Sequence, residues 1–329
     1  MRKIKYLFAS ALVAILVAGC KNDLNVLAPY KDIPVVYGLM DQSDTAHYIR
    51  INKVYEGPGN AYTMATVYDS IYYPTNEISV QLTDTSYGTW IKNIPLTPDS
   101  SIPVPPGTFS YPKQILYKTK YKLNPNDTYG LIITNEKTGK QITGSTILLQ
   151  DVSFANNFAT YPNMPMSFYS TAPSMVQWSS IQNSVIYQMT IRFFYYDSLP
   201  SNPRGSEQYL DWVFPTVSAS SAGYPLEYSY SGQGFLQFLK SSIPVVTGAY
   251  RRSDSIGIIF TSGSNDLNTY IQLSQPSIGI DQDPPSFSDV KNAIGLFTAR
   301  HTQILNKKID PILRDSIMLN SVTAALDFH

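Results

Sequence analysis

Three acidic side chains lie close together near the end of this 329-residue chain, and they are the first candidates for chemistry. Asp281, Asp283 and Asp289 fall within the segment IDQDPPSFSD. Two carboxylates about 5–9.5 Å apart can cleave a glycosidic bond, and oxygen-rich loops suit Ca²⁺. However, Pro284 and Pro285 interrupt the ligand pattern that a calcium loop of the EF-hand type requires. We therefore expect a solvated loop between strands, with a calcium site and a glycosidase as less favoured alternatives.

Histidine and cysteine are scarce, which limits other kinds of catalysis and metal binding. The histidines are His47, His301 and His329, and no two of them have a metal-ligand spacing. Cys20 is the single cysteine, and no G-x-S-x-G nucleophile elbow occurs. We expect His47 to be a half-buried strand residue. The sequence therefore predicts no catalytic residue, no cofactor and no metal ligand, and a protein that is not an enzyme.

Aromatic residues are abundant, with 25 tyrosines, 14 phenylalanines and 3 tryptophans. Exposed aromatic rings can stack on sugars or bind a protein partner, whereas tyrosine is also a common strand residue that packs in a core. We favour the core interpretation and keep an exposed glycan platform as the alternative. The groups in question are Tyr72-Tyr73, Phe193-Phe194-Tyr195-Tyr196, and Tyr224, Tyr228 and Tyr230.

The overall composition excludes two classes of protein. Hydrophobic residues make up 43% and charged residues 15% of the chain, which is enough apolar surface to form a packed core and excludes wholesale disorder. Lysine plus arginine and aspartate plus glutamate both number 24, so the formal net charge is zero. Because no basic excess is available to neutralise phosphates, nucleic acid is not an expected partner.

The N-terminal residues have the pattern of a secretory signal. Arg2, Lys3 and Lys5 form a positively charged start, and residues 7–17 are almost all apolar. An apolar run of about 11–14 residues is shorter than the roughly 20 that a stable membrane-spanning helix needs. The segment is therefore expected to direct export rather than to anchor the chain as a helix.

The residues after this apolar run resemble the lipobox of bacterial lipoproteins. The small residues Ala18 and Gly19 precede Cys20, which stands where the lipobox has its acylated thiol. The resemblance implies that residues 1–19 are a removed signal peptide, that Cys20 is the lipid attachment site, and that residues 20–33 form a lipidated tether. It also implies a protein attached to the outer membrane through that lipid anchor.

Alternating apolar residues predict a mainly β protein. The period of two is clear at Ile78–Leu82 and at Val185–Tyr196, and the 23 prolines and 18 glycines indicate many turns. We also expect strands at Ile256–Phe260 and Thr269–Leu273. Apolar residues at helical spacing predict a helix near 233–242, and we expect one or two such short inserted helices in all.

The strand pattern lapses around residues 151–172, which are rich in Asn, Pro, Met and Ser, and we place a domain boundary here. The chain is then expected to form two β-sandwich domains, at 34–152 and 153–322. The helical insertion falls in the second of them, and residues 323–329 would be a C-terminal tail.

Two large aromatic residues at the start of the second domain resemble a known sandwich. Trp178 and Tyr187 have the spacing found in the B–C strand region of fibronectin type III modules. In that fold the two rings fill the space between the sheets. The resemblance implies that both side chains are buried and in contact.

Most of the chain after Cys20 resembles a family of uncharacterised Bacteroidota lipoproteins. The resemblance implies an immunoglobulin- or transthyretin-like domain followed by a fibronectin type III-like domain, and it implies no activity because that family is a domain of unknown function. The segments that carry it are Pro34–Leu39, His47–Ile51, Tyr129–Ile133, Thr138–Lys140 and Asn292–Phe297.

These observations predict a non-enzymatic lipoprotein of the cell envelope that binds a partner or serves an outer-membrane assembly. The alternative is a carbohydrate-binding accessory protein of a glycan-uptake system, and a glycosidase is the least favoured. The expected partners are the membrane, through Cys20, and a protein or a glycan.

The lipid anchor leads to the first testable prediction. Acyl chains contribute about 0.8 kcal/mol per buried CH₂, and durable attachment needs more than one chain. Because Cys20 is the single thiol, Cys20→Ser should leave the precursor unprocessed or release the protein from the membrane fraction. Metabolic labelling with a fatty acid and cell fractionation measure both effects. Normal processing and membrane retention of this variant would contradict the lipobox assignment.

Overall fold

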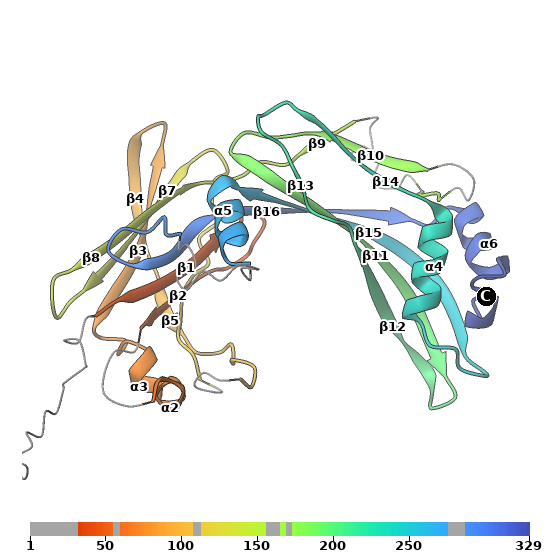
Figure 1. Ribbon diagram of the computed structural model, residues 1–329, viewed down its shortest axis with the longest axis horizontal. Helices are drawn as coiled ribbons and strands as arrows, with labels where there is room; N and C mark the ends of the chain where they lie inside the picture. Colours follow the sequence, from red (N-terminus) through yellow and green to blue (C-terminus); the bar gives the residue numbers. More distant parts are fainter. Residues whose placement is uncertain (1–31, 55–59, 108–112, 156–164, 169–172, 276–286) are drawn as a thin grey trace, which may run out of the picture.

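The computed structural model describes residues 32–54, 60–107, 113–155, 165–168, 173–275 and 287–329. The described chain is mainly β, with three sheets and a few short helices (Figure 1). Cys20, Asp281 and Asp283 lie outside the described residues. The strand content of the described residues confirms the prediction of a mainly β protein.

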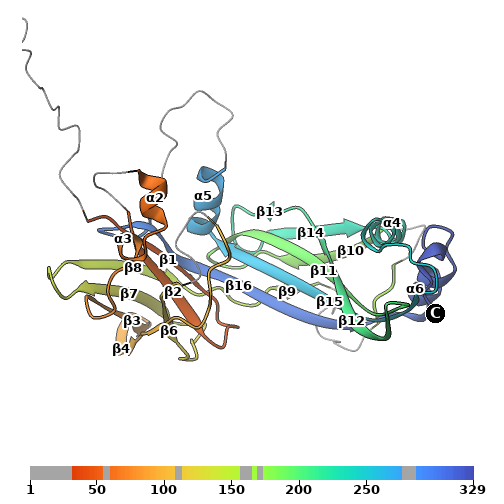
Figure 2. The ribbon, with the colours of Figure 1, turned by 90° about the horizontal axis from the view of Figure 1, so that it is seen from below.

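The largest sheet has nine strands and runs through the whole molecule (Figures 1 and 2). Its order is β12-β11-β15-β16-β1-β2-β6-β5, with β13 paired to β11. The strands are β1 (Pro34–Met40), β2 (His47–Lys53), β5 (Thr97–Asp99), β6 (Leu116–Thr119), β11 (Ser184–Leu199), β12 (Asn202–Val213), β13 (Val217–Ser218), β15 (Tyr250–Ser264) and β16 (Ile294–Lys308).

Two smaller sheets accompany it. One has four strands in the order β4-β3-β7-β8, and the other has three in the order β14-β10-β9. Their strands are β3 (Ile78–Ser86), β4 (Thr89–Pro95), β7 (Thr128–Asn135), β8 (Gln141–Ile147), β9 (Ser153–Phe154), β10 (Ser174–Ser179) and β14 (Pro225–Tyr230).

Four of the short helices in the described ranges, α2, α4, α5 and α6, are capped by polar side chains. Ser231 accepts a hydrogen bond from the backbone of Gly234 at the start of α4, and the apolar face of this helix is buried, as expected for the helix predicted near 233–242. Asp310 caps α6, which begins with a proline. The helices are α2 (Ala61–Ala65), α3 (Tyr68–Ile71), α4 (Gly232–Ser242), α5 (Asn265–Leu273), α6 (Pro311–Leu319) and the 3₁₀ helix η1 (Ala324–Leu326).

The strand expected at Thr269–Leu273 is wrong, because these residues form the second half of α5. Ser264 ends β15 and caps the helix by accepting a hydrogen bond from the backbone of Leu267 at 3.1 Å. Asp266 lies in the first turn, where its charge suits the helix dipole. The five residues Thr269–Leu273, taken without the start of the helix, are too few for periodicity to distinguish a helix from a strand.

Strand β16 lies in the middle of the large sheet and joins its two parts. Its first residues pair in parallel with β1, from Val35 with Ile294 to Met40 with Ala299. Its later residues, from Arg300 to Lys308, pair antiparallel with β15. We call the part containing β1 to β8 and the start of β16 the N-terminal half, and the rest the C-terminal half.

Each half has its own hydrophobic core. In the N-terminal half, residues of the large sheet such as Val36 and Ile49 cluster with residues of the four-stranded sheet such as Leu82 and Leu131. Phe297 of β16 is a fully buried member of the same cluster. The N-terminal core therefore combines residues from the first 150 positions of the chain with a strand from near its end.

Residues 323–329, which we expected to be a tail, are packed against the C-terminal half. Leu326 and Phe328 are buried. Arg251 is fully buried and donates hydrogen bonds to the carbonyl of Leu326 at 2.7 Å and to Asp197 at 2.9 Å. A buried guanidinium needs such partners, so the end of the chain is part of the folded structure.

The C-terminal core is built around Trp178, as expected from the sequence. The Trp178 and Tyr187 side chains are 2% and 0% exposed, and their ring centroids lie 5.9 Å apart. Trp178 also contacts Tyr228 at 5.0 Å and Phe260 at 4.7 Å between ring centroids. The predicted burial and contact of this aromatic pair are therefore confirmed.

This packing predicts a large effect of truncation. Trp178→Ala should lower the free energy of unfolding by about 3–5 kcal/mol, because it removes buried apolar surface and leaves a cavity. Trp90→Ala is the matched control, since Trp90 is 63% exposed and should change stability by less than about 0.5 kcal/mol. Urea denaturation of both variants checks the difference. Equal stabilities would contradict the packing described here.

Candidate functional site

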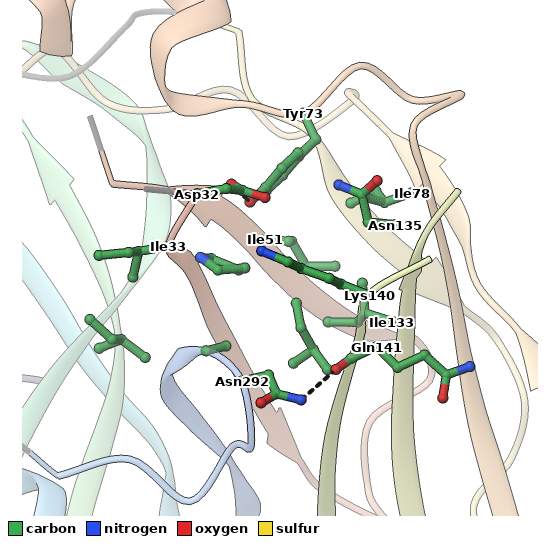
Figure 3. Close-up of a pocket in the computed structure, with 14 residues that line it drawn as sticks. Asp32, Ile33, Ile51, Tyr73, Ile78, Ile133, Asn135, Lys140, Gln141 and Asn292 are labelled. Carbon is green, nitrogen blue, oxygen red and sulfur yellow. Dashed lines mark hydrogen bonds between the residues drawn. The ribbon is translucent and has the colours of Figure 1, made fainter. Parts of the chain in front are cut away.

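The N-terminal half contains a pocket of about 590 Å³ at the end where β1 begins (Figure 3). We call it the aliphatic pocket, because isoleucines supply most of its apolar wall. Its lining consists of Asp32, Ile33, Pro34, Ile51, Tyr73, Ile78, Ile133, Asn135, Lys140, Gln141, Ile142, Asn292, Ala293 and Ile294.

Strand alternation places the isoleucines on the inner wall. Ile51, Ile133 and Ile142 come from β2, β7 and β8, and each is at most 6% exposed. Successive strand residues point to opposite faces of a sheet, so each of these three strands turns its isoleucine toward the pocket. Ile51 comes from the large sheet, and Ile133 and Ile142 come from the four-stranded sheet. Tyr73, which is 5% exposed, adds the single aromatic ring among the lining residues.

Polar groups surround this apolar wall. Tyr73 donates a hydrogen bond to Asp32 at 2.6 Å, and Asn292 donates one to the carbonyl of Gln141 at 2.9 Å. Asn135 holds the β7–β8 turn by accepting bonds from two backbone N–H groups at 3.0 Å. Figure 3 shows Lys140 reaching into the pocket from the side of β8.

The aliphatic pocket has few ionisable side chains. Among its lining residues, Asp32, Lys140 and Tyr73 are the ionisable ones, and no histidine, cysteine or serine takes part. A concave, mostly apolar wall with a few polar groups at the rim is the usual form of a small-molecule site. Such a site would enclose an apolar group and leave a polar group near Asp32 and Lys140.

A second group of polar residues lies where the two halves meet. His301 follows the point at which β16 leaves β1. Its Nδ1 lies 3.0 Å from Asp41 and its Nε2 lies 2.6 Å from Asp151. Gln42 donates a hydrogen bond to the carbonyl of Leu149 at 2.9 Å. This junction cluster therefore connects β1, the segment after β8 and β16.

Hydrogen bonding sets the charges of the junction cluster. Burial alone would lower the pKa of His301, but its contacts with Asp41 and Asp151 outweigh burial and raise the pKa above its ordinary value. Burial alone would raise the pKa of Asp41, but hydrogen bonds from His301 and Ser43 hold it below its usual value. Both shifts favour the charged forms of His301 and Asp41.

Among the candidates that the structure describes, Asp289, His47, His301 and His329 lie in different surroundings. The backbone N–H of Phe297 donates a hydrogen bond to Asp289 at 2.8 Å, and burial raises the pKa of Asp289. His47 is buried in β2, and burial lowers its pKa. The ring of His329 stacks on Tyr250, with centroids 4.6 Å apart. His47 and His329 thus have structural positions, while His301 forms the junction cluster.

Most of the aromatic groups lie in the cores. Buried members are Tyr72, Tyr73, Phe193, Tyr195, Tyr228 and Tyr230. Tyr224 is 52% exposed, so this residue alone among the named groups lies largely on the surface that the structure describes. The core interpretation therefore fits these groups better than a glycan platform.

Sequence reasoning missed Lys140, Asp32 and the junction cluster as candidates for function. Lys140 follows Gly139 in the turn between β7 and β8, where a lysine is an ordinary surface residue. The partners of His301 lie 150 and 260 positions away along the chain. No local pattern contains that information.

No helix in the described ranges is long and apolar enough to cross a membrane. In the same part of the chain, no group of three or more His, Cys, Asp or Glu side chains is placed to hold a metal ion.

Comparison with known proteins does not identify a family. No family model and no curated protein matches the chain. Among solved structures, it is similar to CBD12 from CALX1.2, with 8% identity, a TM-score of 0.18, and coverage of 84% of this chain and 99% of that one. It is also similar to the C-terminal globular domain of an oligosaccharyltransferase from Pyrococcus abyssi, with 6% identity, a TM-score of 0.16, and coverage of 62% and 41%.

The junction cluster predicts a pH-dependent stability. Because the folded pKa of His301 is raised, its stabilising effect should be complete below the unfolded value of about 6.5 and be lost as the pH rises through the folded value. His301→Gln should lower the free energy of unfolding by about 1–3 kcal/mol near pH 6, since it removes the cationic partner of the buried Asp41, which then keeps only its hydrogen bonds from Ser43. Above about pH 6.5, the free energy of unfolding of this variant should also change less with pH than that of the wild type.

Urea denaturation at a series of pH values measures both effects. His329→Gln is the matched control, because this terminal histidine is exposed. A His301→Gln variant with the same pH dependence as the wild type would show that the junction cluster does not couple protonation to stability.

Proposed function

We propose that the protein is a lipid-anchored, non-enzymatic binding protein of the outer membrane, and that its aliphatic pocket takes the apolar part of a small amphipathic molecule. The observation that carries this proposal is the pocket itself, which has a volume of about 590 Å³, an isoleucine wall and a polar rim. This volume lies in the range of roughly 300–1,000 Å³ that is typical of small-molecule sites.

The position of the pocket along the chain supports a role near a membrane. Asp32, Ile33 and Pro34 line the pocket, and Cys20 precedes them by a short segment. A chain of this length spans at most about 40 Å when fully extended. If Cys20 carries the lipid, the pocket is held close to the bilayer, where amphipathic molecules are concentrated.

The fold that accompanies this proposal is a pair of β-sandwich domains of the immunoglobulin and fibronectin type III kinds. Its support is the presence of two hydrophobic cores, each combining strands of the large sheet with strands of a smaller sheet. β16 would then be shared by both domains. Such scaffolds place binding residues at the ends of their strands, as the aliphatic pocket does.

A glycosidase has the least support. The backbone N–H of Phe297 bonds to Asp289, so this carboxylate has a structural partner. The tyrosine groups that suggested a glycan-uptake protein do not support that alternative, because most of them are buried.

Filling the aliphatic pocket tests the proposal. Ala293 is a partly exposed lining residue, so Ala293→Phe should reduce the volume of the pocket without opening the core. The wild-type protein should bind the fluorescent fatty acid cis-parinaric acid saturably, and Ala293→Phe should bind it at least about tenfold more weakly, a loss of about 1.4 kcal/mol. Fluorescence titration measures both dissociation constants.

Two further variants make the test specific. Ala325→Phe, at an exposed site near the chain end, is the matched control and should bind like the wild type. Lys140→Gln should weaken binding of the fatty acid more than binding of the corresponding alcohol, because a carboxylate loses a cationic partner and a hydroxyl does not. Absence of saturable binding, or equal binding by Ala293→Phe, would overturn the proposal.

A further inference from the structure

A second cavity lies on the outer face of the large sheet, beside α5. It has a volume of about 430 Å³ and is separate in its lining from the aliphatic pocket. We call it the tyrosine groove. It is lined by Tyr37, Gly38, Leu39, Asp44, Ala46, Tyr48, Leu267, Tyr270, Ile271, Leu296 and Arg300.

Strand alternation explains why aromatic residues reach this outer face. Val36 and Met40 of β1 are buried in the N-terminal core, so Tyr37 and Leu39 between them point outward and are each 36% exposed. Tyr48 lies on the same face of β2, because its neighbour Ile49 is in the core. Exposed apolar side chains on a sheet face that a helix borders form a natural binding surface.

Helix α5 forms the other wall of the groove. Tyr270 donates a hydrogen bond to the hydroxyl of Tyr37 at 3.2 Å, and the two rings meet edge to face with centroids 6.0 Å apart. Burial and this hydrogen bond raise the pKa of Tyr37 to about 12. The hydroxyl is therefore neutral at physiological pH, so it can both donate and accept hydrogen bonds.

One basic and one acidic side chain complete the groove. In the described part of the chain, Arg300 has no carboxylate within ion-pair distance, and its buried Nε has no hydrogen-bond partner. Asp44 is close enough for Arg300 to affect its pKa, which burial raises. The lining thus has no net charge, but it offers hydrogen-bond donors from Arg300 and acceptors from Asp44.

We propose that the tyrosine groove binds a neutral saccharide of one to three units. A sugar ring has an apolar face that packs on tyrosine and leucine side chains, and its rim of hydroxyls both donates and accepts hydrogen bonds. Tyrosines with an unpaired arginine and an aspartate match both properties, whereas a purely anionic ligand would face Asp44. This site uses none of the tyrosine groups noted in the sequence, and it is independent of the aliphatic pocket.

The test uses an array of neutral mono-, di- and trisaccharides, followed by calorimetric titration with the saccharide that binds best. The wild-type protein should bind at least one of them saturably. Arg300→Gln and Tyr270→Ala should each weaken binding by about tenfold or more, since each removes a central contact. Tyr270 lies on a helix that contains no buried residue, so its truncation should leave the protein folded.

Matched controls separate the groove from the rest of the surface. Arg204→Gln and Tyr209→Ala, at exposed positions of β12, should bind the saccharide like the wild type. Ala293→Phe should also bind the saccharide normally, so the proposals for the aliphatic pocket and for the tyrosine groove can be refuted separately. The proposal is overturned if no saccharide on the array binds, or if Arg300→Gln and Tyr270→Ala bind as tightly as the wild type.

Discussion

The hydrogen-bond ladder along β16 is the constraint on which the rest of the structure depends. One strand of 15 residues pairs in parallel with β1 and then antiparallel with β15. Backbone N–H and C=O groups in a sheet interior must be paired, so neither half completes its part of the large sheet without β16. Phe297 fills the N-terminal core from the same strand.

This shared strand also requires close backbone contact at one point. Gly295 has a φ of 130°, and a Cβ atom there would lie 1.9 Å from the carbonyl oxygen of Val36. No side chain fits in that space, and the conformation is one that glycine adopts readily. The parallel register between β1 and β16 therefore depends on a glycine that the sequence pattern alone shows only as a break in an apolar run.

The sequence predicted those features that local periodicity determines. Trp178 and Tyr187 lie on strands with a clear period of two, so their burial could be foreseen, and the apolar spacing after Ser231 located α4. The helix at 265–273 was missed because only its second half was considered, which is too short for periodicity to separate a helix from a strand, although Ser264 followed by Asp266 is a recognisable helix start.

The sites could not be predicted, because distant segments form them. The tyrosine groove combines Tyr37, Tyr270 and Arg300, and the junction cluster joins Asp41 to a histidine 260 positions later. Each residue alone is an ordinary strand or helix residue. Only the pairing of β1 with β16 brings them together, and parallel pairing between the two ends of a chain leaves no signature in composition or spacing.

The place of β16 in the chain determines when the protein can fold during synthesis. Strands β1 to β8 end at Ile147, but β16, the parallel partner of β1, begins at Ile294. As the chain emerges from the ribosome, the N-terminal half therefore lacks a neighbour for β1 and the Phe297 side chain of its core until almost all residues have been made. Long-range pairing of this kind is slow to form. Completion of the N-terminal core therefore has to wait for a strand that is made near the end of synthesis.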